Sequence, residues 1–207
     1  MERLDFGIPV VVEGKYDQMK LAEVYAGPIV RTDGFAIFRR NETDALLRRL
    51  GGERGLIVLT DPDGAGTVIR RHLSSVLPPE RIYHLYVPRV AGKERRKRTP
   101  SREGVLGVEG MPAEVLRDLL LRFAAANGLA DGAGGRRAGG ITKADFYEWG
   151  LTGRRGAAEA RDRFAERLQL PSGMTPGALL TAANLLTDRE TAEALALGEE
   201  GGAHDVR

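Results

Sequence analysis

The sequence predicts an α/β protein in which a parallel sheet of about four strands is flanked by helices and followed by a small all-helical domain. Two observations support this prediction. Short runs rich in valine and isoleucine alternate with helical segments over residues 8–126, which is typical of a parallel sheet with crossover helices. Beyond a glycine-rich stretch, residues 141–198 contain helical patterns only.

Four apolar runs are expected to be the strands of this sheet, at residues 8–12, 29–30, 56–59 and 81–87. Helical spacing of apolar residues predicts helices at 16–26, from a cap at Asn41 to residue 50, at 64–77 and at 112–126. The alternation of Ile82, His84 and Tyr86 favours an edge position for the last strand. Four further helices are expected at 143–149, 157–168, 177–186 and 188–197.

These elements divide the chain into segments of different composition. Residues 1–126 form the predicted α/β domain and residues 141–198 the helical domain. Residues 127–140 contain six glycines and almost nothing to bury, so we expect a flexible linker there. We expect residues 199–207 to be a disordered tail.

Composition excludes several kinds of site. The chain has no cysteine, which rules out disulfides, iron–sulfur clusters, Cys-ligated zinc and thiol nucleophiles. Its three histidines leave little scope for a histidine-based metal site or a Ser–His relay. The apolar run near the N-terminus ends at Glu13 and is too short for a signal peptide or a membrane span, so we expect a cytoplasmic protein without membrane contact.

Positive charge is concentrated in one short segment. Residues 89–102 carry seven basic residues against Glu94 alone, in a chain whose net charge is only +2. No aromatic residue lies within this segment, which favours contact with backbone phosphates over stacking on bases. A solvated surface loop without a ligand is the alternative. The predicted contacts to nucleic-acid phosphates are Lys93, Arg95, Arg96, Lys97, Arg98 and Arg102.

Acidic residues follow two of the predicted strands directly. Glu13 ends the first strand, and Asp61 and Asp63 follow the third. Ligands of a parallel α/β sheet bind outside the carboxyl ends of its strands, so the three carboxylates would converge if the two strands are neighbours. Such a cluster of oxygen ligands suits Mg²⁺ or Mn²⁺. Helix capping by Asp63 and a local turn at Asp61 remain the structural alternative.

At these residues the chain resembles a known family. The segments VVEGK (residues 11–15) and TDPDG (60–64) look like the Toprim domain of topoisomerases, primases and several nucleases. Among Toprim proteins the chain is similar to the ribonuclease M5 family, the maturases of bacterial 5S ribosomal RNA. That similarity extends through RTDGFAI (31–37), IVLTDPD (57–63) and GVE (107–109), and more weakly through KADF (143–146) and GLTG (150–153).

The resemblance implies Mg²⁺-dependent hydrolysis of phosphodiesters on both strands of a base-paired stem in precursor 5S rRNA. It implies a helper, the 5S-binding ribosomal protein (large-subunit protein eighteen). By motif, Glu13 and Asp61 hold one catalytic ion and Asp61 and Asp63 a second, with Mn²⁺ as a substitute. Lys15 would contact the RNA, and Asp17 and Glu109 match accessory positions of the family.

Two other functions stay open. The same chemistry could act on another structured RNA or on DNA, or the protein could be a non-catalytic rRNA-binding assembly factor. The carboxylates favour an enzyme, because without a cation they would repel RNA.

Overall fold

The computed structural model describes residues 2–33, 39–52, 55–61, 64–88, 90–92, 106–129 and 139–198. The chain forms two compact units, one from Met1–Ala36 and Leu50–Gly135, the other from Ile37–Arg49 and Arg136–Arg207. The expected tail at 199–207 and most of the expected linker lie outside the described residues. No helix within the described ranges is long and apolar enough to cross a membrane.

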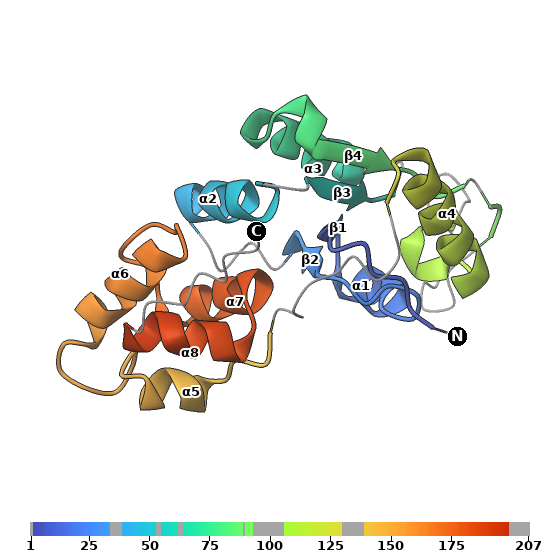
Figure 1. Ribbon diagram of the computed structural model, residues 1–207. Coiled ribbons are helices and arrows are strands. Elements are labelled where there is room, and N and C mark those ends of the chain that lie inside the picture. Colours follow the sequence, from blue (N-terminus) through green and yellow to red (C-terminus); the bar gives the residue numbers. More distant parts are fainter. Residues whose placement is uncertain are drawn as a thin grey trace. The chain divides into compact units, whose positions relative to one another are not determined.

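The first unit contains a four-stranded parallel sheet in the order β2-β1-β3-β4 (Figure 1). Its strands are β1 (Val10–Val12), β2 (Ile29–Arg31), β3 (Leu56–Leu59) and β4 (Ile82–Leu85). All residues of β1 and β3, the two central strands, are buried, as their continuous apolar runs predict. The predicted parallel sheet is confirmed, and β4 takes the predicted edge position.

The direction of chain travel reverses between the two central strands. From β1 the chain passes through α1 (Lys15–Leu21) to β2 on one side. From β3 it passes through α3 (Gly64–Val76) and the 3₁₀ turn η2 (Pro79–Arg81) to β4 on the other side. Right-handed crossovers therefore place α1 and α3 on opposite faces of the sheet. The reversal creates a topological switch point between β1 and β3, where ligands of such sheets bind.

One face of the sheet carries a large hydrophobic core cluster. Alternate residues of the strands, Val10 and Val12 with Ile57 and Leu59, pack with α1 and with helix α4 (Ala113–Ala126). The short 3₁₀ helix η3 (Val108–Gly110) joins this core through Val108, which is almost fully buried. Because η3 is anchored there, the chain leading into α4 passes close to the carboxyl ends of the strands.

Two predicted helix boundaries are wrong. Helix α1 ends at Leu21 rather than at residue 26, because Tyr25 turns inward, is buried, and donates a 2.5 Å hydrogen bond to the carbonyl of Ile8. Asn41 is not a cap, because α2 (Arg40–Leu50) begins one residue earlier. The Glu42 side chain instead reaches back to the N–H of Arg39, satisfying one of the free donors at this end.

The second unit holds α2 and the four predicted C-terminal helices. These are α5 (Lys143–Glu148), α6 (Ala157–Arg167), α7 (Pro176–Leu186) and α8 (Arg189–Leu197). Phe164 of α6 is fully buried and packs edge-on against Phe146 of α5, with ring centroids 5.9 Å apart. Asp188 caps α8, accepting a hydrogen bond from the N–H of Thr191.

Candidate active site

Glu13 and Asp61 lie at the same edge of the sheet, on the two strands that flank the switch point. Glu13 follows β1 directly, and Asp61 follows β3 after Thr60. The strands are hydrogen-bonded neighbours with Val11 opposite Val58, so their carboxyl ends coincide. The condition for convergence of these carboxylates, adjacent strands, is therefore met. Asp63 lies outside the described residues.

The Asp61 carboxylate is held by a segment distant in the sequence. The backbone N–H of Val108 in η3 donates a 2.8 Å hydrogen bond to Asp61 Oδ1. A Cβ added at Gly107 would lie 2.1 Å from Asp61 Oδ2, and one added at Gly66 would lie 2.1 Å from the Asp61 carbonyl oxygen. The backbone at both positions therefore lies so close to Asp61 that only glycine, which has no Cβ, fits there. Asp61 therefore does more than form a local turn, because its carboxylate is held in place by the backbone of η3.

Asp17 and Glu109 belong to the same acidic neighbourhood. Asp17 Oδ2 accepts a 3.0 Å hydrogen bond from the N–H of Gly14 at the start of α1. The pKa of Asp17 is raised to about 6, mainly by burial and to a smaller extent by the carboxylates of Asp61 and Glu109, while backbone hydrogen bonds from Gly14 and Glu109 oppose the rise. Asp17 is thus close enough to both Asp61 and Glu109 to interact with each of them electrostatically.

The donor chemistry of this edge fits a divalent cation. Its side chains are carboxylates, the ligands that Mg²⁺ and Mn²⁺ prefer, and their mutual repulsion is relieved by positive charge. No three acidic or histidine side chains within the described ranges are grouped closely enough to hold one ion. The expected ligand set includes Asp63, which is not among the described residues.

Of the basic residues predicted to contact RNA, the structure describes Lys15 but not those of the basic segment. Lys15 is the first residue of α1 and is exposed beside Glu13. The predicted contacts of the basic segment, Lys93, Arg95, Arg96, Lys97, Arg98 and Arg102, all lie outside the described residues.

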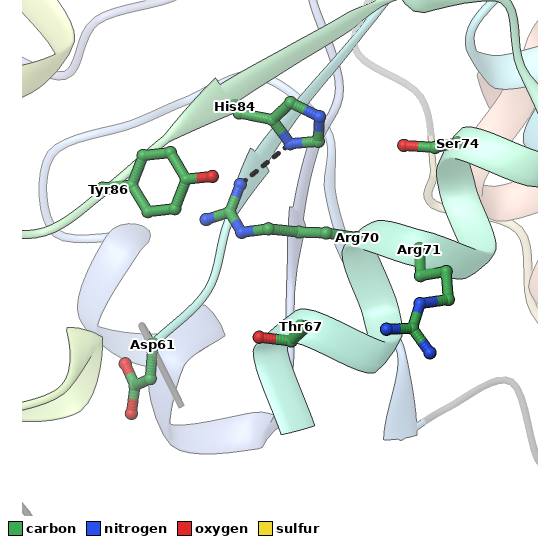
Figure 2. Close-up of a pocket in the computed structure, with 7 residues that line it drawn as sticks. All are labelled: Asp61, Thr67, Arg70, Arg71, Ser74, His84 and Tyr86. Atoms are coloured by element: carbon green, nitrogen blue, oxygen red, sulfur yellow. Dashed lines mark hydrogen bonds between the residues drawn. The ribbon is translucent and has the colours of Figure 1, made fainter. Parts of the chain in front are cut away.

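Sequence reasoning missed a group of residues beside Asp61. A cavity of about 380 Å³ opens between α3 and β4, with Asp61 at one end (Figure 2). Its wall contains Arg70, a buried arginine whose guanidinium lies 4.0 Å from the ring centre of Tyr86. An arginine among the apolar residues of α3 was the available sequence signal. The alternation of His84 and Tyr86 predicts an edge strand but not their contact with Arg70.

A parallel sheet in the order β2-β1-β3-β4, with a glutamate after β1 and an aspartate after β3, defines a Toprim-type α/β domain. Comparison with curated proteins identifies the family. A protein named ribonuclease M5 1 from Ligilactobacillus salivarius strain UCC118 is 31% identical over 168 residues, covering 81% of this chain and 80% of its own. The chain therefore belongs to the ribonuclease M5 family.

Other relatives match over a shorter region. Ribonuclease M5 of Lactiplantibacillus plantarum is 39% identical over 101 residues, which is 48% of this chain and 49% of that protein. Ribonuclease M5 of Bacillus subtilis strain 168 is 31% identical over 111 residues, 54% of each chain. The chain thus matches about half the length of these two relatives.

Two further comparisons add little to this assignment. No family model matches the chain. A solved structure of a small TOPRIM domain protein from Bacillus stearothermophilus covers 63% of this chain and 95% of its own at 27% identity, with a TM-score of 0.40. That superposition is too loose to add to the sheet topology.

Proposed function

We propose that the protein is a Mg²⁺-dependent endoribonuclease that cleaves both strands of a base-paired stem in precursor 5S rRNA. The observation that carries this proposal is the position of Glu13 and Asp61 at the switch point of the sheet, with Asp61 fastened to η3 by the Val108 N–H. Membership of the ribonuclease M5 family supports the type of substrate. A carboxylate site facing RNA is difficult to explain without a cation.

In this proposal Glu13, Asp61 and Asp63 are the catalytic and metal-binding residues. Bound Mg²⁺ supplies charge neutralisation at the scissile phosphate and activation of the attacking water. The hydrogen bond from Val108 keeps the Asp61 carboxylate in one orientation, and the Asp17 carboxylate fixes the start of α1 next to Glu13. Lys15, which is exposed on the first turn of α1, would contact a phosphate oxygen.

The remaining expectations extend the proposal to partners and location. The basic segment around residues 93–102 would hold the phosphate backbone of the stem. The 5S-binding ribosomal protein (large-subunit protein eighteen) would present the precursor in a cleavable form, and the reaction would take place in the cytoplasm. Helices of the second unit would contribute to binding the RNA or the ribosome.

The test is cleavage of an end-labelled 5S precursor with Mg²⁺ or EDTA, with and without the helper protein. Wild type should cut both strands of the stem, and Asp61→Asn should lower the rate by about a hundredfold or more, because an amide cannot replace a carboxylate at the ion. Asp118→Asn is the matched control, since Asp118 is exposed on α4 and pairs with Arg122. Full activity of Asp61→Asn would refute the assignment of the site.

The same assay separates the alternatives. Cleavage of a different structured RNA or of DNA, with the 5S precursor left intact, would contradict the proposed substrate but support the proposed active site. Tight binding without cleavage under any condition would favour an assembly factor. A metal site should also raise the melting temperature on addition of Mg²⁺, in wild type but not in Asp61→Asn.

A further inference from the structure

The cavity beside Asp61 combines hydrogen-bond donors with an aromatic wall. Asp61 marks the end that adjoins the candidate active site (Figure 2). Its volume of about 380 Å³ lies near the lower limit of ligand sites. The other lining residues come from α3 and from the end of β4, and they are Thr67, Arg70, Arg71, Ser74, His84 and Tyr86.

Arg70 forms the fixed base of this cavity. Its guanidinium donates to the carbonyl oxygens of Val58 (3.2 Å), Thr60 (3.4 Å) and Leu85 (2.8 Å), and to Nδ1 of His84 (3.0 Å). These bonds tie the ends of β3 and β4 to α3. Because its donors are largely used, Arg70 orients its neighbours and is not available to bind a ligand.

The contact with Arg70 also determines which ring nitrogen of His84 carries the proton. A guanidinium has no acceptor, so Nδ1 of His84 must accept the bond, and the proton of the neutral imidazole resides on Nε2. Figure 2 shows this second ring nitrogen turned away from Arg70. His84 is exposed and therefore presents an N–H donor to the cavity.

Arg71 supplies a positive charge that no acidic residue in the described part of the chain neutralises. It is exposed, and within the described ranges it makes no hydrogen bond or ion pair. Thr67, Arg71 and Ser74 are spaced four and three residues apart, so they share one face of α3 over about 10 Å. The charge and the hydroxyls of this face suit the phosphate and ribose groups of a nucleotide.

We propose that this cavity is a nucleotide subsite that binds the RNA strand next to the scissile phosphate. Arg71 pairs with the neighbouring phosphate, while Ser74 and the Nε2–H of His84 hydrogen-bond to phosphate or ribose oxygens. The ring of Tyr86, half exposed and held from one side by Arg70, forms the flat wall against the sugar or base. The subsite rests on the proposed nuclease function, because Asp61 belongs to both.

The experiment measures binding of a fluorescein-labelled, base-paired RNA stem by anisotropy, in EDTA and at several KCl concentrations. The variants are Arg71→Ala and Arg71→Lys, with Arg122→Ala as the control, since Arg122 is an exposed arginine on α4 that pairs with Asp118. Loss of one phosphate contact should reduce the salt slope by about one and weaken binding about eightfold at 0.1 M KCl. Arg71→Lys should restore the slope and part of the affinity, because lysine keeps the charge without the bidentate geometry.

Parallel cleavage assays of the 5S precursor in Mg²⁺ distinguish failure of the subsite from failure of the proposed function. If wild type cleaves and Arg71→Ala binds like Arg122→Ala, the subsite is refuted and the nuclease stands. If wild type binds RNA without cleaving it, and Arg71→Ala binds about eightfold more weakly, the phosphate contact of Arg71 stands and the proposed nuclease function fails. If wild type binds no RNA, both are refuted.

Discussion

Replacing Gly107 by alanine tests the role of η3 in holding the candidate catalytic aspartate. The new Cβ would lie 2.1 Å from Asp61 Oδ2 and 2.7 Å from its Cγ, whereas the shortest ordinary C···O contacts are about 3.3 Å. The carboxylate or the η3 segment must therefore move by about 1.2 Å, which breaks or stretches the 2.8 Å bond from Val108 to Asp61 Oδ1.

A displacement of this size has a large expected effect on catalysis and a moderate one on stability. A shift of about 1 Å in a catalytic group can lower the rate by about a hundredfold. Overpacking and the lost hydrogen bond should lower the free energy of unfolding by about 1–3 kcal/mol. The assays are single-turnover cleavage of the 5S precursor, urea unfolding, and the Mg²⁺-induced rise in melting temperature.

Gly14→Ala is the matched control for this experiment. Gly14 borders the same site, but a Cβ there would meet nothing closer than 3.8 Å, and its φ of −132° suits any residue. We expect Gly14→Ala to stay within about threefold of wild-type activity, the residual cost arising from its position at the helix cap. Equal activity of Gly107→Ala and Gly14→Ala would refute the conclusion that η3 positions Asp61.

Three further predictions concern the side chains of Arg70, Phe164 and His84. Arg70→Met should lower the free energy of unfolding by about 2–4 kcal/mol in urea titrations, because buried carbonyls lose their donor. Phe164→Ala should cost about 3–5 kcal/mol, since its ring is fully buried against Phe146. Burial and the adjacent Arg70 lower the pKa of His84 below 6.5, so its contribution to stability is complete above about pH 6.5 and declines as the pH falls toward the folded-state pKa.

Each of these predictions has a control. Arg122→Met, at an exposed surface pair, should change stability by less than about 0.5 kcal/mol, and an equally mild Arg70→Met would contradict the first prediction. Phe164→Leu should recover most of the loss in the second, whereas equal losses would contradict a packing effect. For the third, the free energy of unfolding should be measured from pH 5 to 8. Its decline as the pH falls should be smaller in His84→Gln than in wild type. Identical pH profiles would contradict it.

Local patterns in the sequence predict the strands of the sheet and part of the candidate active site. The apolar runs of β1 and β3 and the helical spacing after them are short-range signals, and they predict these elements without any knowledge of tertiary contacts. Glu13 and Asp61 were found because a residue directly after a strand must lie at the carboxyl edge of a parallel sheet. The end of α1 was missed because the burial of Tyr25 against Ile8 depends on tertiary packing.

The sequence by itself determined the alternating α/β order, the helical C-terminal region and the two acidic strand ends, because each depends on residues near one another in the chain. Only the tertiary structure decided that β1 and β3 are neighbours, that Val108 binds Asp61 across 47 residues, and that Arg70 meets His84 and Tyr86. These contacts depend on the path of the chain across the sheet. That path is determined by burial of the sheet faces and by right-handed crossovers, and the local periodicity of the sequence does not predict it.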